Sequence, residues 1–325
     1  MLGCTLCSVG CATTPYRYGH FRDRGAELPS KAEIVYGEPN PTLDRMAWVV
    51  ALPARLLQLH PKVNSHSLSA ETTEELQTYL QENEITDVLV RVNQYDPAGE
   101  WRRLRLNTRI APGWRYTFGT ASVIGYTIIP GRVFGGDAYN PFTNSLYVNS
   151  DVAAMLISEA AYAKDVHSRS LPGTYAAINE FPVLTLWRHT NAVNDTLGYA
   201  LKNDDWELER ETYRTVYPLM GIHAALGGQS AASHVAAIPM ITIPISVVGG
   251  ALAGHTVGQT TIAQRERQRR LLQPDELATD QTSVLPEEPG STHISSSGVR
   301  LVGFEEISEA ETDQTSQVES PARLP

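Results

Sequence analysis

The sequence predicts an α+β fold in which a mixed sheet leads into a long helix, and three observations indicate it. Residues 86–93 (TDVLVRVN) and 145–148 are short apolar or β-branched runs of the kind that form strands. The second run is followed directly by residues 151–165, whose apolar positions suit a helix. With 325 residues, of which 42% are hydrophobic, the chain can bury at least one sizeable core.

Local patterns assign the remaining elements of this domain. Residues 46–59 and 69–81 are predicted helices, and the second opens with Ser69 and several acidic residues, which suit a helix N-terminus. Residues 101–106 are expected to form a second strand or a short helix. Residues 116–129 favour a strand because they are rich in aromatic and β-branched side chains.

The net charge of −10 is carried almost entirely by the C-terminal tail. Residues 271–325 hold eleven Asp or Glu against two Arg, so the rest of the chain is nearly neutral. Because phosphate binding needs clustered Lys and Arg, we expect no nucleic-acid partner. The tail is also rich in Ser, Thr, Gln and Pro, a composition that predicts disorder.

The three cysteines all fall in the first eleven residues, so they cannot organise the body of the protein. The small residues before Cys11 resemble a bacterial lipobox, in which that cysteine is acylated. The segment lacks the usual Leu three residues earlier and a basic stretch ahead of it, which raises the alternative of a start codon placed too far downstream. Another interpretation is a redox-capable pair, Cys4 and Cys7.

Fifty consecutive residues, 215–264, contain no Asp, Glu, Lys or Arg. Within them, residues 235–253 come close to the roughly 20 apolar residues that a helix needs to cross a bilayer. Pro239 and Pro244 count against a crossing, because each removes a helix hydrogen bond. We expect a membrane helix or helical hairpin with the lipid bilayer as partner; a buried hairpin in a soluble domain is the alternative.

Gly250, Gly254 and Gly258 recur every four residues and line one helix face, where a second helix can approach closely. They predict a hairpin within the chain or a homo-oligomer. If the chain crosses once, the basic cluster at residues 265–270 marks the cytoplasmic side, and the folded domain lies on the other side, in the bacterial cell envelope. If it crosses twice, the cluster is an interfacial anchor.

These patterns divide the chain into five expected parts. They are a signal or lipobox-like segment at 1–11, an extended linker at 12–45, the α+β domain at 46–212, a glycine-rich apolar membrane segment at 213–262, and a basic cluster with an acidic tail at 263–325.

The run GGDAYNPFTNSLYVNSDVAAMLISEAAYAKD, residues 135–165, resembles a family of bacterial zincin-like proteins whose members carry a similar run ending in HEAGHAKD. The resemblance extends over residues 48–199, about half the chain, and includes VRVNQYDPAGEWRRL at 90–104 and GWRYTFG at 113–119. It implies a zincin-like mixed sheet with an active-site-type helix.

In zincins, two His on one helix face bind zinc, and the Glu after the first His is the general base. The matching positions here are Ser158, Glu159 and Tyr162, so only the vestigial base remains. The resemblance places a third, normally acidic ligand at His189, with Asp195 two helical turns farther along. Catalytic zinc needs three firm protein ligands, so zinc is expected in relatives and no metal or other cofactor is expected here.

Three interpretations of this site stay open. Glu159 either is a structural carboxylate that pairs with Lys164 or Arg188, or keeps some chemistry. Ser158 with His167 or His189 would give a hydrolase with non-standard residues, although no nucleophile elbow surrounds the serine. A groove that binds a peptide along strand 145–148 is the third. The sequence favours a catalytically inactive, membrane-attached envelope protein that binds or scaffolds a peptide or protein partner.

Overall fold

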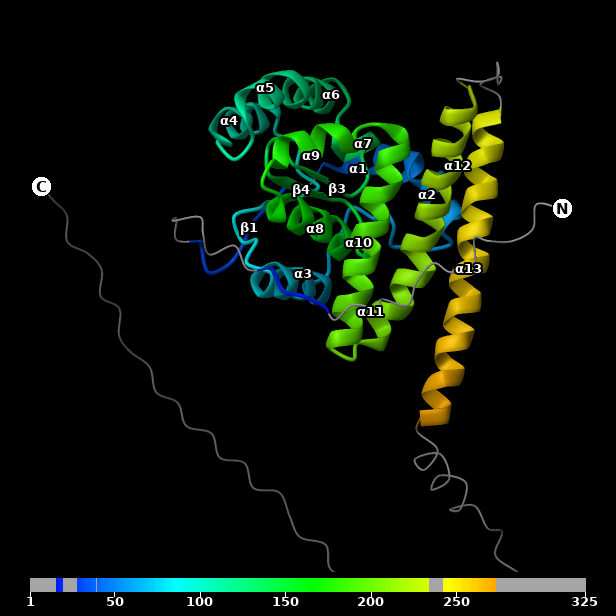
Figure 1. Cartoon of the computed structure of the whole chain (residues 1–325). Helices are drawn as coiled ribbons and strands as arrows, with labels where there is room; N and C mark the ends of the chain where they lie inside the picture. The colour runs from blue at the N-terminus through cyan, green and yellow to red at the C-terminus, as the bar shows by residue number, and fades with distance from the viewer. Residues whose placement is uncertain (1–15, 20–27, 39, 234–241, 273–325) are drawn as a thin grey trace, which may run out of the picture. The chain divides into compact units, whose positions relative to one another are not determined.

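A computed structural model of the chain describes residues 16–19, 28–38, 40–233 and 242–272 (Figure 1). The described residues belong to one compact unit that ends at Leu272. The lipobox-like segment with Cys11 and the acidic tail from residue 273 lie outside the described residues, so these two expectations stay predictions.

A four-stranded mixed sheet forms the centre of the fold, which confirms the α+β class. Its strands are β1 (Glu33–Tyr36), β2 (Leu89–Val92), β3 (Ala138–Asn140) and β4 (Ser145–Val148), in the order β1-β2-β4-β3. The β1–β2 and β2–β4 pairs are parallel, and β3 runs antiparallel to β4. Strand β1 lies within the segment predicted to be an extended linker. Its residues EIVY instead pair one by one with those of β2.

Helices surround the sheet. They are α1 (Pro41–Val50), α2 (Leu52–Gln58), α3 (Ala70–Glu82), α4 (Pro97–Leu106), α5 (Pro112–Trp114), α6 (Thr120–Ile128), α7 (Gly131–Phe134), α8 (Ala153–Ser168), α9 (Pro172–Asn179), α10 (Pro182–Lys202), α11 (Trp206–Glu211), α12 (Tyr217–Ser233) and α13 (Thr242–Leu272), with π-helical turns η2 (Arg115–Gly119) and η3 (Thr212–Val216).

Most predicted elements are present. The helices predicted at 46–59, 69–81 and 151–165 are confirmed as α1 with α2, α3 and α8, and the Ser69 hydroxyl caps α3 by accepting from the amide of Thr72. The strand predicted at 116–129 is wrong, because this segment forms η2 and α6. Its Val123 packs in a second apolar cluster with Leu104 and Phe142, and this tertiary packing overrides strand propensity.

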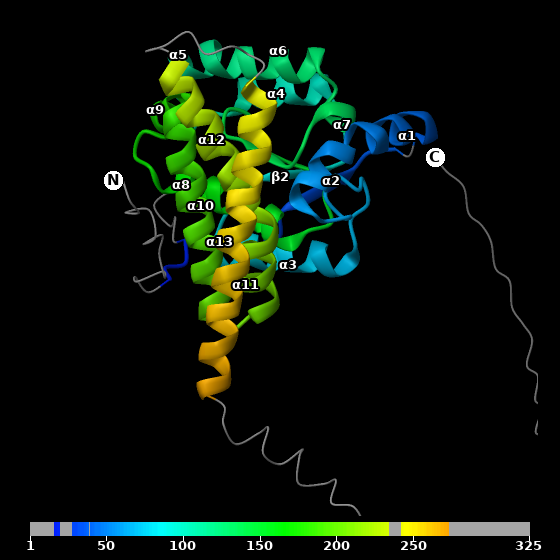
Figure 2. The same cartoon turned by 90° about the vertical axis from the view of Figure 1, so that its right-hand side faces the viewer.

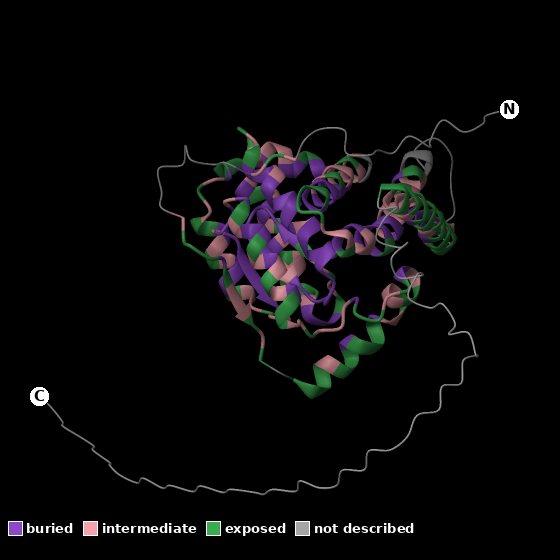
Figure 3. Cartoon of the chain, turned by 90° about the horizontal axis from the view of Figure 1, so that it is seen from below, coloured by how far each residue is buried: buried purple, intermediate pink, exposed green. Residues whose placement is uncertain are grey.

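Helix α8 is the most deeply placed element, with thirteen of its sixteen residues buried. It follows β4 directly and packs on the sheet, on α3 and on α10. Apolar side chains of β2 and β4, among them Val90, Leu146 and Val148, belong to the same core cluster as Leu156 and Ala160 of α8. Figure 3 shows this buried centre in purple. Every polar group on α8 therefore needs a partner inside the protein.

Helices α12 and α13 form a hairpin against this core (Figure 1). A Cβ atom added at Gly254 would lie 2.3 Å from the carbonyl oxygen of Tyr217, and one at Gly258 would lie 2.2 Å from that of Tyr213. At Gly250 the corresponding distance to the oxygen of Gly221 is 2.4 Å. The glycine face is thus occupied within the chain, and a homo-oligomer through these three glycines would require the hairpin to open.

In the part of the chain that the structure describes, no helix is long and apolar enough to cross a membrane. The expected membrane window is only partly covered, because its residues 235–241 lie outside that part.

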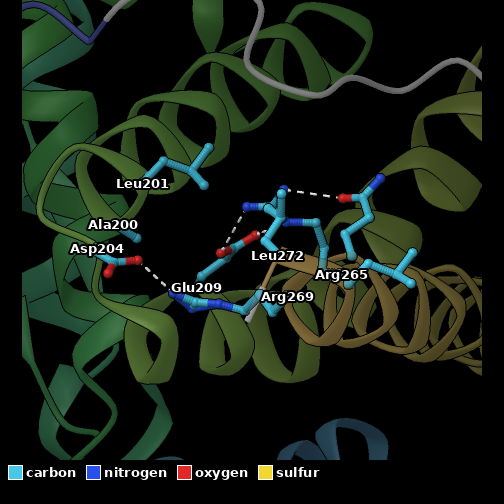
Figure 4. A pocket seen from close by; sticks show the side chains of 9 residues that line it. Ala200, Leu201, Asp204, Glu209, Arg265, Arg269 and Leu272 are labelled. Carbon is cyan, nitrogen blue, oxygen red and sulfur yellow. Dashed lines mark hydrogen bonds and ion pairs between the residues drawn. The ribbon is translucent and has the colours of Figure 1, made fainter. Parts of the chain in front are cut away.

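The basic cluster has partners within the domain. Arg265 donates from Nε to Glu209 Oε1 over 2.7 Å, and Arg269 pairs with Asp204. Together these pairs flank a cavity of about 390 Å³ between the end of α13 and α10–α11 (Figure 4). The charged groups beside this cavity bind each other and thereby hold the end of α13 against α11. Two of the four arginines of the basic cluster, Arg265 and Arg269, therefore have partners within the protein and need no membrane surface.

The hairpin packing predicts the effect of a single methyl group. Gly254→Ala is expected to lower the free energy of unfolding by about 1–3 kcal/mol, because the added Cβ meets backbone. Gly249→Ala is the matched control: a Cβ there meets nothing within 4 Å, and alanine is the better helix former by about 1 kcal/mol. Guanidinium unfolding measures both. Equal effects of the two substitutions would contradict the close approach of α12 and α13.

Candidate functional site

Three of the four positions that match the zincin motif line one cavity in the structure. Ser158 and Glu159 of α8 and His189 of α10 line one cavity of about 20 Å³. Its other lining residues are Asp137 and the apolar side chains of Met155, Val216, Leu219 and Met220. A space of this size holds about one water molecule. Apolar side chains of η3 and α12 close this space.

Glu159 is tied to the edge of the sheet. Its Oε2 accepts from the backbone amide of Tyr139 on β3 over 3.0 Å. Burial raises the pKa of the carboxyl group, while the positive charge of Arg188 and the amide of Tyr139 act in the opposite direction. The carboxylate thus joins β3 to α8.

His189 makes two contacts that fix its ring. Arg188 Nη2 lies 3.2 Å from His189 Nε2, and since a guanidinium only donates, that nitrogen accepts and the ring proton is on Nδ1. The ring also stacks on His223 of α12, with 4.0 Å between centroids and 18° between planes. Burial, followed by the charge of Arg188 and by His223, lowers the pKa of His189 to about 2. His189 is therefore neutral at ordinary pH.

Tyr162 completes the cluster as a buried aromatic group. Its ring lies edge-on to Tyr139 at 5.7 Å, and the guanidinium carbon of Arg188 lies 4.5 Å from the ring centroid. Such a cation–π contact is favourable, the more so where water is excluded. One guanidinium thus contacts the residues at two of the motif positions, Tyr162 and His189.

The donor set fits zinc poorly. Zinc prefers imidazole, thiolate or carboxylate ligands, and a hydroxyl stands at Ser158 while an aromatic ring stands at Tyr162. The one imidazole at a motif position, His189, already directs the lone pair of Nε2 to Arg188. Among the described residues, no three His, Cys, Asp or Glu side chains are grouped so that they could hold a metal ion.

The other candidate residues belong to separate clusters. Lys164 Nζ pairs with Asp195 Oδ1 over 2.6 Å and also donates to the hydroxyl of Tyr16 over 2.9 Å. Lys164 is therefore not the partner of Glu159, and Asp195 is not near the cavity lining. His167 lies beside Asp87, with 3.9 Å between Nε2 and Oδ1.

Two of the open interpretations lose support from this geometry. His167 follows Ser158 by nine positions on α8, which separates them by about 13 Å along the helix axis, and the acceptor nitrogen of His189 already accepts from Arg188, so neither histidine is placed to act as a base for the serine. Strand β4 cannot pair with an added peptide, because β2 and β3 occupy both of its edges. The expectation of augmentation at residues 145–148 is therefore wrong; a period-2 pattern does not tell an edge strand from a central one.

Sequence reasoning missed two contributors. Asp137 lines the cavity, and its Oδ1 accepts from the amides of Asn149 and Ser150 over 2.7 and 2.9 Å. His223 lies 34 positions after His189, and only the packing of α12 on α10 brings the two rings together. In the sequence, the one feature that sets His223 apart is its position in the uncharged segment 215–264.

Comparison of the chain with protein-family models, with curated proteins and with solved structures found no match.

The neutral His189 predicts acid sensitivity. Its pKa of about 2 in the folded state lies below the ordinary 6.5, so the unfolded chain binds the extra proton and stability falls as pH drops below 6.5. Between pH 6.5 and about 4.5 this one group accounts for a loss of about 2 kcal/mol. His189→Gln, which keeps an acceptor for Arg188, is expected to lose that part of the pH dependence. Urea unfolding of both proteins at both pH values measures it, and identical slopes would disprove the assignment.

Proposed function

We propose that the chain is a catalytically inactive, zincin-like protein of the bacterial cell envelope that binds or scaffolds a peptide or protein partner at the membrane. The observation that carries the proposal is the hydrogen bond from Arg188 to His189 Nε2. In this proposal the guanidinium of Arg188 binds the nitrogen of His189 that would bind the metal ion in a zincin.

The electrostatic argument has two parts. A nitrogen lone pair that accepts from a guanidinium is not available to a metal, so a zinc ion would first have to displace that hydrogen bond. The same guanidinium carries a full positive charge beside His189 Nε2, which opposes the binding of a second cation at that nitrogen. Arg188 therefore both neutralises the surroundings of Glu159 and opposes zinc.

The shape of the cavity supports the same conclusion. A hydrolytic site needs room for a substrate carbonyl and a water molecule beside the general base. Met155, Leu219 and Met220 border a space of about 20 Å³, which takes no peptide. Glu159, bonded to the amide of Tyr139, serves as a structural carboxylate.

Attachment to the envelope membrane is the second part of the proposal. It rests on the lipobox-like residues before Cys11 and on the fifty uncharged residues at 215–264. A single acyl chain binds membranes only marginally, so a second membrane-directed element is required. The main domain is proposed to lie on the non-cytoplasmic side.

Zinc content tests the loss of the metal site. The unmodified full chain is expected to bind no stoichiometric zinc. The double substitution Ser158→His with Tyr162→His is expected to bind little zinc as long as Arg188 is present. Adding Arg188→Met to these two substitutions is expected to give about one zinc per chain, because two introduced imidazoles then join that of His189 without the opposing charge. Elemental analysis after dialysis measures all three proteins.

The matched control carries Ser158→Ala, Tyr162→Phe and Arg188→Met, which removes the same charge but adds no ligand. It is expected to stay free of zinc. Stoichiometric zinc in the unmodified chain would refute the proposal, as would peptidase activity that Glu159→Gln abolishes.

A further inference from the structure

Helices α1 and α2 expose an unusual number of large apolar side chains. On α1 the side chains of Met46, Trp48 and Val49 are each more than half exposed, at 52%, 53% and 54%. At α2 and its C-terminal end, Leu56 and Leu59 are exposed to more than 70%. Ala47 is the only residue of α1 that is buried, so this helix packs on the domain through a narrow contact.

The outer side of α13 continues this surface. Ile245, Val248 and Leu252 are exposed at helical spacing, on the side away from the glycines that contact α12. Helix α2 lies against α13, where His255 Nε2 is 2.8 Å from the carbonyl oxygen of Leu57. In Figure 2, α13 and α2 lie on the side that faces the viewer, and α1 extends from α2 to the right-hand edge. We call the exposed apolar residues of these three helices the docking face.

The charge of the docking face differs from that of the whole chain. Residues 242–264 of α13 carry no charged group, and α1 and α2 carry only Asp44, Arg45 and Arg55. Asp44 is neutralised by Arg132, whose Nη2 lies 2.6 Å from its carboxylate. The face is therefore net basic in a protein of net charge −10, and Arg45 is exposed beside the apolar side chains.

We propose that the docking face rests on the surface of a bilayer that contains anionic phospholipids. Helices with apolar residues on one side and basic residues beside them lie in the plane of a membrane interface, where the apolar side chains reach about 5–10 Å deep. Trp48 has the amphipathic ring that favours this depth. The basic character selects anionic headgroups, because each Arg or Lys near such a surface adds attraction.

The inference rests on the membrane attachment proposed above and names its second element. It is independent of the metal question, because the cavity and the docking face lie on opposite sides of α12: Leu219 and Met220 border the cavity, whereas Gly221 contacts α13.

Vesicle flotation of the full chain tests the inference, with Cys11→Ser to remove any acyl anchor. The protein is expected to float with phosphatidylcholine–phosphatidylglycerol vesicles, and its tryptophan emission to shift to shorter wavelength, a shift that Trp48→Phe is expected to remove. Met46→Glu with Val49→Glu, and separately Ile245→Glu with Leu252→Glu, are each expected to lower the partition coefficient more than about tenfold. Arg45→Ala is expected to lower it about fivefold on these vesicles and to change nothing on pure phosphatidylcholine.

The control pair is Leu106→Glu with Leu171→Glu, two residues of similar exposure, 70% and 68%, that lie on other faces. It is expected to bind as the unmodified chain does, and circular dichroism verifies that every variant is folded. No flotation of the Cys11→Ser chain, or equal loss in control and face variants, would overturn the inference. So would a dimer in sedimentation that only the face variants dissociate. Zinc analysis of the same preparations tests the inactive site separately, so the two failures are distinguishable.

Discussion

The burial of α8 on every side is the constraint on which the rest of this structure depends. A helix with thirteen buried residues gives most of its polar side chains little access to water, so they gain from partners within the protein. Glu159 finds the amide of Tyr139, and Lys164 finds Asp195 and the hydroxyl of Tyr16. These partners come from β3, α10 and the N-terminal segment, so the polar groups of one helix fix the position of three other parts of the chain.

The same constraint explains why the cluster around Arg188 differs from a metal site. If the family resemblance holds, loss of two imidazoles would leave a buried carboxylate without a cation, which is costly in a medium of low polarity. A guanidinium supplies the charge, and its planar donors also reach a histidine and an aromatic face. Under the proposed inactive function, an apolar cavity lining is tolerable, since no substrate enters.

Elements set by local pattern could be predicted from the sequence, and those set by packing could not. Ser69 as an N-cap and the strand followed by the helix at 145–165 are local signals, and the structure contains both. The segment 116–129 has strand-like composition, but Val123 and its neighbours gain more from burial as a helix. Ser158 and Glu159 are adjacent on one helix in the sequence pattern, whereas the stacking of His223 on His189 depends on where α12 packs.

The hairpin links the two proposals in one physical argument. Helix α12 borders the cavity with Leu219, Met220 and the ring of His223, and on its other side it holds α13 through glycines that allow no Cβ. A helix packed this closely on two sides cannot move away to admit a substrate without also displacing α13. Under the docking proposal, α13 is the element that rests on the bilayer. The same packing of α12 then has two consequences: it closes the cavity, and it holds a rigid helix that faces the membrane. A protein that uses α12 in this way gains a stable docking surface but loses an accessible catalytic site.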